Sequence, residues 1–144
     1  MLLKKEDVPL VSEGFMNEVH DEDRKIINDI FDEIIKYEKK PSYNTKVNIA
    51  VLFQKWFNHT VKHFSKEEKK MRKVRYPRYK IHKQEHTRTL AEMHTVYSDW
   101  LKTNDIYILK NYFTDVLPTW IVEHIETMDM EASSFFKENQ INLN

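Results

Sequence analysis

Residues 63–86 begin and end with a pair of polar side chains whose spacing limits how the chain can fold. His63 and Glu67 open this stretch, His82 and His86 close it, and the members of each pair are four residues apart. Residues four apart share one face of an α-helix, so the sequence predicts two helices joined by a basic turn. Unpaired polar groups are costly in a protein core, so two such faces turned inward would have to be paired or bound to a metal.

The composition favours a single all-α domain that spans residues 1–144. The chain has one glycine and four prolines, too few for the turns of a many-stranded β fold. It has no cysteine, so any metal must be held by nitrogen and oxygen ligands. Lys plus Arg (23) equals Asp plus Glu (23), so no global charge favours nucleic acid or an anionic membrane. The N-terminus lacks the apolar segment of a secretion signal, and no apolar run approaches the ~20 residues of a membrane span. We therefore expect a soluble, cytoplasmic protein without membrane contact.

Hydrophobic periodicity predicts four amphipathic helices, over residues 15–38, 45–73, 78–102 and 115–137, with Pro118 in the first turn of the last one. Short breaks join them, which favours an up-down-up-down four-helix bundle. On the fourth helix, His124 and Asp129 are five residues apart, an offset of about 140° in an α-helix, so Asp129 is expected at the flank of the inward face. A nitrogen and oxygen ligand set suits iron or manganese, although zinc and copper accept the same donors.

These motifs resemble those of the bacterial hemerythrins. The chain reads "HFSKEEKKM", then "YPRYKIHKQEH", then "LPTWIVEHIETMD", against a family pattern of H-F-x-x-E-E-x-x-M, a Y-P turn, H-x-x-x-H and W-x-x-x-H-I-x-x-x-D. The resemblance implies a four-helix bundle with a non-haem di-iron centre that binds dioxygen reversibly. By this resemblance, His82, His86 and His124 would bind one iron, which is coordinatively filled. Glu67 and Asp129 would bridge the two iron ions together with an oxo or hydroxo group. His63 would bind the second iron, which has an open position.

The first helix departs from the family, which places one more histidine ligand there in a segment that reads approximately I-D-E-Q-H-K-x-L. This chain reads "VHDEDRKI" from Val19 to Ile26. When Val19 and Ile26 are aligned with their apolar counterparts, the ligand position falls on Asp23. Asp23 is also central in the apolar stripe, whereas His20 is about 60° from that centre. We therefore predict that Asp23 is the seventh ligand and that His20 lies at the surface. The alternatives are that Asp23 forms a salt bridge or lies in a solvated helix start, and that His20 supplies the ligand from one turn earlier. His59, one turn before His63, would line the oxygen pocket, donate a proton or serve as a half-buried polar residue.

The basic turn between the second and third helices suggests partners. Basic side chains there alternate with two tyrosines, Tyr76 and Tyr79; the basic residues are Lys69, Lys70, Arg72, Lys73, Arg75, Arg78, Lys80 and Lys83. Basic and aromatic residues together are typical of nucleic-acid contact, but cations at a helix C-terminus also complement its dipole. We expect no nucleic acid and consider this turn a docking face for an unidentified acidic protein partner. An acidic cluster at residues 18–23 raises weak self-association, so a monomer or weak homo-oligomer is expected.

Three functions follow from these observations. The first is a dioxygen-binding di-iron protein, a carrier, local store or sensor, and not an enzyme. The second is an oxidase or peroxidase-type enzyme that turns over oxygen or peroxide at the same centre, which an anionic ligand at Asp23 would favour. The third is a degenerate protein that holds one metal.

Overall fold

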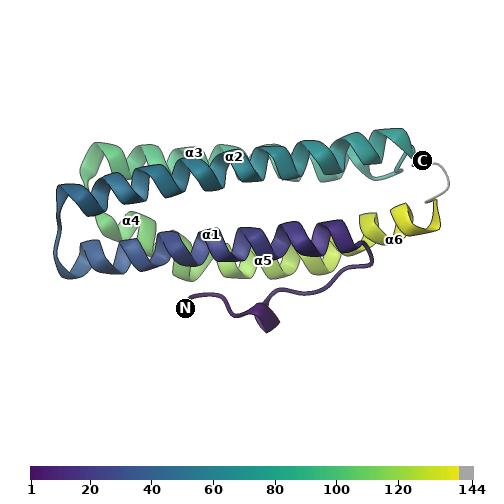
Figure 1. Cartoon of the computed structure of the whole chain (residues 1–144). Helices are drawn as coiled ribbons and strands as arrows, with labels where there is room; N and C mark the ends of the chain where they lie inside the picture. Colours follow the sequence, from purple (N-terminus) through teal and green to yellow (C-terminus); the bar gives the residue numbers. More distant parts are fainter. Residues whose placement is uncertain (140–144) are drawn as a thin grey trace.

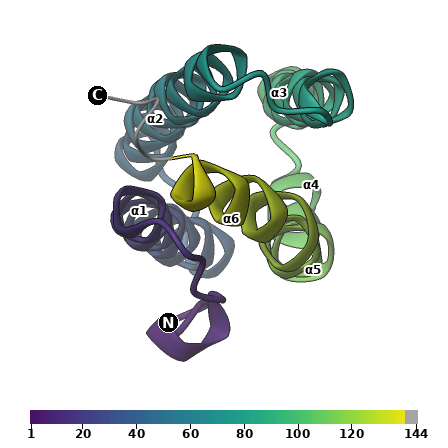
Figure 2. The ribbon, with the colours of Figure 1, turned by 90° about the vertical axis from the view of Figure 1, so that its right-hand side faces the viewer.

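The computed structural model describes residues 1–139, which form an antiparallel bundle of four helical rods (Figure 1). The first three rods are α1 (Gly14–Lys39), α2 (Tyr43–Lys73) and α3 (Tyr79–Thr103). The fourth rod is continuous but has five segments: α4 (Ile106–Asn111), the π-helical turn η2 (Tyr112–Val116), α5 (Leu117–His124), the π-helical turn η3 (Ile125–Asp129) and α6 (Met130–Glu138). Seen along the bundle axis, the rods occupy the corners of a square, with α1 between α2 and α5 (Figure 2). The predicted all-α, up-down-up-down bundle is confirmed.

Local side-chain bonds fix where the helices begin and end. Ser42 precedes α2, and its hydroxyl accepts a hydrogen bond from the backbone N–H of Thr45 at 3.1 Å. Asp105 does the same for α4 through the N–H of Tyr107 at 3.0 Å. Between α3 and α4, Asn104 takes the left-handed conformation (φ 55°) that ends many helices. These caps satisfy backbone groups that the helix ends leave unpaired.

The fourth rod begins earlier than predicted, at Ile106 instead of near Asp115. The prediction began it close to Pro118, because proline is tolerated only in the first turn of a helix. The rod continues past Pro118 because the wide turn η2 comes immediately before it. A proline clashes with the carbonyl four residues earlier, which here belongs to Thr114, inside the turn whose hydrogen-bond ladder is already widened.

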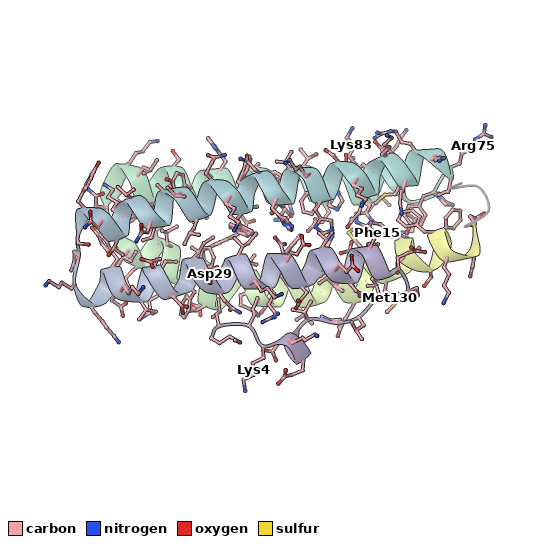
Figure 3. All side chains as sticks on the ribbon, in the orientation of Figure 1. Lys4, Phe15, Asp29, Arg75, Lys83 and Met130 are labelled. Atoms are coloured by element: carbon pink, nitrogen blue, oxygen red, sulfur yellow. The ribbon has the colours of Figure 1, made fainter. Side chains whose placement is uncertain are left out.

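Apolar side chains fill the bundle on both sides of a polar middle layer (Figure 3). The larger apolar group lies towards the α1–α2 and α3–α4 connections; its fully buried members include Ile30, Ile34, Ile49, Met93, Trp100, Leu109 and Phe113. The smaller group lies towards the α2–α3 turn and contains Met71, Tyr76, Ala132 and Phe136. Within residues 1–139, no helix is both long enough and apolar enough to cross a membrane.

Residues 1–13, here called the strap, run along the outside of the bundle beside α1 and α5 and include the short 3-10 helix η1 (Lys5–Asp7) (Figures 1 and 2). Two asparagines of α1 fasten the strap. Asn28 accepts from the backbone N–H of Leu3 at 2.8 Å and donates to its carbonyl at 2.9 Å. Asn17 pairs with the backbone of Val11 in the same way, at 2.8 and 3.0 Å. The strap therefore buries a flank of α1 that would otherwise face solvent.

Candidate metal centre

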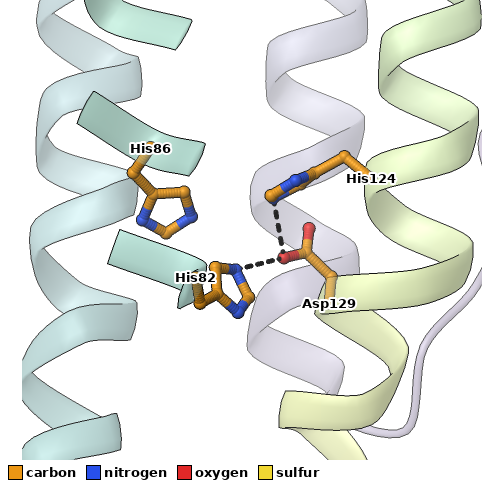
Figure 4. Close-up of side chains that lie close together, drawn as sticks. All are labelled: His82, His86, His124 and Asp129. Carbon is orange, nitrogen blue, oxygen red and sulfur yellow. Dashed lines mark hydrogen bonds and ion pairs between the residues drawn. The ribbon is translucent and has the colours of Figure 1, made fainter. Parts of the chain in front are cut away.

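Two groups of buried histidine and carboxylate side chains lie next to each other in the polar middle layer. The first, here called the four-residue group, contains His82, His86, His124 and Asp129 (Figure 4). The second, the three-residue group, contains His20, His63 and Glu67. Within each group the potential ligand atoms lie within 4.8 Å of one another. All four rods contribute, and every one of these side chains is buried. The bundle thus concentrates seven potential ligands in one place.

The two carboxylates lie between the groups and reach both. Oδ1 of Asp129 is 3.1 Å from Nε2 of His82 and 3.1 Å from Nε2 of His124, while its Oδ2 is 3.1 Å from Nε2 of His20 in the other group. Glu67 contacts His63 of its own group, and its Oε1 is 3.4 Å from Nε2 of His86. Because each carboxylate has oxygen atoms near both groups, the arrangement suits two metal ions that share two carboxylate ligands.

The π-helical turn η3 explains how Asp129 reaches this position. Five residues separate it from His124, and in a regular α-helix they would be about 140° apart. In a π-turn the N–H of one residue bonds to the carbonyl five residues earlier, so residues five apart come nearly into line. Asp129 is the last residue of η3 and is 1% exposed. It therefore lies on the inward face with His124 and not at the flank that the α-helical spacing predicted.

Several polar atoms in this layer fit a metal centre because no hydrogen bond occupies them and their close contacts are with the other potential ligands. Among the described residues, Nε2 of His63, His86 and His124 and both carboxylate oxygens of Glu67 are buried without a hydrogen bond. Unsatisfied buried polar atoms usually have a specific explanation, an ion among them. These atoms come from three of the four rods and converge, and their nitrogen and oxygen chemistry suits iron. The residues present therefore fit a dinuclear metal site.

Electrostatics keeps both carboxylates ionised, the form that binds metal. Burial and the nearby Asp129 raise the pKa of Glu67, but the imidazole of His63 and a hydrogen bond with His86 outweigh them and lower it to about 2. Burial likewise opposes ionisation of Asp129, yet His124 and two further histidines hold its pKa well below its usual value. Burial lowers the pKa of His63, but Glu67 raises it to about 9. The layer is therefore a set of mutually stabilised charges.

Neighbouring side chains orient the histidines of the four-residue group. The Nδ1–H of His86 donates to Oε2 of Glu68 at 2.9 Å, which leaves Nε2 directed at the centre. Phe64 stacks on the ring of His86 at a centroid distance of 3.7 Å. Trp120 stacks on His124 at 4.6 Å. Metal-binding histidines usually hold a carboxylate or carbonyl with their second nitrogen. The Glu68 contact was not predicted from the sequence, although Glu68 directly follows a predicted ligand.

The first helix differs from the prediction. His20, expected at the surface, is 5% exposed and belongs to the three-residue group. Its ring lies 5.2 Å from that of His63, measured between centroids. Asp23, predicted as the ligand, is not a member of either group. Its Oδ1 is 3.1 Å from Nδ1 of His59, and 21% of its side-chain surface is exposed. The surface assignment of His20 was therefore wrong, and Asp23 has the ion pair that was its alternative role.

The strap is the physical reason for this error. The prediction considered only the apolar stripe of α1 and centred it with Val19, which is only half-buried. Arg24 and Asn28, on the same flank as His20, are 8% exposed each because Leu3 of the strap lies over them. A segment outside the helix thus widens the buried face of α1 towards His20. In the sequence, three polar residues one helical turn apart, at positions 20, 24 and 28, mark the flank of α1 that the structure shows to be buried.

His59 lies between two carboxylates along the line where α1 packs against α2, here called the α1–α2 seam. Its Nδ1 is 3.1 Å from Oδ1 of Asp23, and its Nε2 is 3.0 Å from Oε2 of Glu22. The hydrogen bond with Asp23 raises the pKa of His59 more than its partial burial lowers it. His59 is half-buried, as one of its predicted roles required, and it is not among the residues that line the cavity described below.

A small cavity adjoins the three-residue group. Its volume is about 30 Å³, and both histidines of that group, His20 and His63, line it. From the four-residue group only His124 and Asp129 reach it. Much of the remaining wall is apolar and includes Ile27, Trp56, Met93, Leu117, Ile121 and Ile125. A cavity admits one water molecule for roughly each 10–15 Å³ of such volume, so this one suits a molecule of two or three heavy atoms.

The basic turn gives less support to nucleic-acid contact than its sequence does. Tyr76 is 5% exposed and packs against Phe135 and Phe136 inside the bundle, so it cannot stack on a base. Tyr79 accepts a hydrogen bond from Arg72 at 2.9 Å. Arg75 and Lys83, by contrast, point away from the bundle (Figure 3). Charged side chains remain available to a protein partner there.

Comparison with known proteins agrees with this geometry. The model of the family described as "Hemerythrin HHE cation binding domain" matches residues 14–134. The chain is 24% identical over 129 residues to the protein named bacteriohemerythrin from Aquifex aeolicus (strain VF5), a match that covers 90% of this chain and 93% of that protein. No solved structure matches the chain significantly. Because the family model covers most of its length, the chain belongs to the hemerythrin HHE cation-binding domain family.

Proposed function

We propose that this protein holds two iron ions and binds dioxygen reversibly, as a carrier, local store or sensor. The observation that carries the proposal is the pair of adjacent ligand groups with two carboxylates that reach both. Similarity to a protein named bacteriohemerythrin supports it.

Each group would hold one ion. His82, His86 and His124 would bind the first, His20 and His63 the second, and Glu67 and Asp129 would bridge them. His20 takes the role predicted for Asp23 because its Nε2 lies within the three-residue group and Asp23 is turned to His59. When bound, iron supplies the electrons that dioxygen accepts and returns. The chain's own part is to hold the ions, to keep both carboxylates ionised and to exclude bulk water from the layer.

The size and walls of the cavity support dioxygen as the ligand. Sites for organic molecules are typically about 300–1,000 Å³, and this cavity is about 30 Å³. Its apolar walls offer few hydrogen bonds to water. A small neutral molecule fits such a space, whereas an organic substrate does not.

One observation favours a second candidate, an enzyme that reduces oxygen or peroxide at the same centre. Asp23 lines the cavity and is paired with His59, whose other nitrogen contacts the exposed Glu22. These three side chains connect the cavity to solvent by polar groups that exchange protons. A carrier needs no such path, whereas oxygen reduction consumes protons.

Iron quantitation with optical spectra separates these functions. Anaerobic titration with Fe(II) should saturate near two equivalents per chain, and cycles of deoxygenation and air exposure should return the same spectra. Saturation at one equivalent would identify a single-metal protein and refute the dinuclear proposal. Two equivalents with irreversible oxidation on first exposure to air would favour the enzyme.

A further inference from the structure

The cavity beside the three-residue group is lined mainly by buried side chains. Eighteen residues line it, and all but three of them are buried. The three exceptions, Val8, Asp23 and Trp120, are half-buried and mark the places where the wall reaches the surface. Any molecule that enters from solvent has to pass one of them.

Two of these three side chains make polar contacts. Trp120 donates its indole N–H to Glu85 at 2.7 Å and stacks on His124. Asp23 is paired with His59 at 3.1 Å. Val8, in contrast, has only apolar contacts available to its side chain. It packs against the apolar core and is the one of the three that no side-chain hydrogen bond or ion pair fixes.

A surface groove begins directly outside Val8. The groove has a volume of about 440 Å³ and lies between the strap and α1. Val8 and His20 line both the groove and the inner cavity. These two residues thus form the partition between a space open to solvent and the potential metal ligands. His20 is fixed by its contact with Asp129, so Val8 is the member of the partition whose side chain no polar contact fixes.

The backbone around Val8 is built to open locally. The two asparagine clamps hold the strap at Leu3 and Val11. Residues 4–10 arch between the clamps, and Lys4 on this arch points into solvent (Figure 3). Within the described part of the chain, the hydrogen bonds of the arch stay inside it: Lys4 to Asp7, and Val8 to Lys5. Segments with few buried contacts open at low free-energy cost, so the arch can lift while both clamps stay closed.

We propose that Val8 is the specificity-determining gate of the oxygen cavity and that the groove between strap and α1 is its vestibule. This inference rests on the proposed function for the identity of the ligand. An apolar gate passes a neutral molecule such as dioxygen, but it retards water and small anions, because moving them past apolar atoms costs free energy. Val8 thereby protects bound dioxygen from being displaced by water or by small anions.

Substitutions at Val8 test the gate by size and by polarity. Val8→Ala should raise the dioxygen association rate constant severalfold, and Val8→Phe should lower it severalfold. Val8→Thr has nearly the same shape, so dioxygen association should stay close to that of the wild type, while azide should bind the oxidised protein severalfold faster. Glu6→Ala is the matched control, because Glu6 is on the same arch, is exposed and lines neither the cavity nor the groove.

Asp23→Asn tests the competing route along the α1–α2 seam. For all of these variants, tryptophan fluorescence gives a readout that does not depend on iron. Trp56 and Trp120 line the cavity and Trp100 does not. Quenching by dioxygen in the protein as isolated should therefore rise in Val8→Ala and fall in Val8→Phe, with Glu6→Ala unchanged. If quenching and association rates are the same in all Val8 variants, the gate proposal is overturned, and a change in Asp23→Asn alone would place access at the seam. Lack of iron or of an oxygen adduct would overturn the proposed function instead, while the quenching series would still decide the role of Val8.

Discussion

The four-residue group and the three-residue group lie side by side, yet their surroundings differ. Around the first, Glu68 fixes His86, and aromatic rings cover His86 and His124. Around the second, the neighbours are a cavity, a strap fastened at two points and an ion pair that is partly exposed. The first group has three histidines and the second has two. The first group thus has more potential ligands and firmer neighbours, whereas the second has fewer and contributes both of its histidines to the wall of the cavity.

This difference indicates a division of labour. A complete ligand set in a rigid frame retains its metal, while an incomplete set next to a cavity leaves a coordination position for an incoming ligand, as catalytic metal sites do. The two carboxylates that reach both groups would couple them. Variants that damage one group and spare the other can therefore break or sharpen the comparison.

The largest effect is expected from His86→Ala and His82→Ala. Each removes a potential nitrogen ligand from the four-residue group and leaves Glu67 or Asp129 with one imidazole partner fewer in a buried layer. A metal present at 100 times its dissociation constant stabilises the fold by about 2.7 kcal/mol, so loss of this contribution should lower Tm by on the order of 10 °C. Iron content and Tm should fall together when both are measured in iron-replete buffer.

Iron-free wild-type protein is the control for this prediction, because it separates loss of metal from loss of packing. If both variants kept two iron ions and a wild-type Tm, these histidines would be ordinary core residues and the division between the groups would fail.

A smaller and more selective effect is expected from the pair His20→Ala and Asp23→Ala. His20→Ala removes one of two imidazoles from the three-residue group, so the chain should retain about one iron, held by the four-residue group. Asp23→Ala breaks a partly exposed ion pair, a contact worth roughly 0–1 kcal/mol, and should retain both. Iron per chain after gel filtration distinguishes the two outcomes. Retention of two irons in His20→Ala together with loss of one in Asp23→Ala would restore the sequence-based assignment of Asp23 as the ligand.

The sequence predicts the four-residue group and most of the fold because the evidence for each lies within single helices. Pairs four residues apart on a shared face locate His63 and Glu67 on α2 and His82 and His86 on α3, and apolar periodicity locates the four rods. The grouping of His82 and His86 with His124 and Asp129 comes from the resemblance to the bacterial hemerythrins. The exact position of Asp129 depends on a π-turn, which a fixed 100° rotation per residue cannot represent. The same wide-turn geometry before Pro118 hid the first nine residues of the fourth rod.

The assignment on α1 depends on contacts between distant segments. His20 is buried because the strap lies over its flank, and Asp23 is satisfied by His59 of α2. Neither contact leaves a periodic pattern in α1 itself. Burial on one helix is therefore decided by everything that packs on it, including a strap without regular structure.

The smallest effect tests what makes the four-residue group rigid. Glu68→Ala removes the acceptor for Nδ1–H of His86 but leaves all seven ligands in place. Loss of such a partner typically weakens metal binding about 10–100-fold, so iron should dissociate faster to a chelator while the stoichiometry stays at two. Glu68→Gln keeps an oxygen acceptor without the charge and should recover part of the affinity, which separates orientation of the ring from electrostatic support. Glu92→Ala is the control, because Glu92 pairs with Arg88 on the exposed face of α3. If Glu68→Ala released iron no faster than Glu92→Ala, the rigidity of the four-residue group would come from the stacked rings of Phe64 and Trp120. The contrast between the two groups would then rest on packing and not on hydrogen bonding.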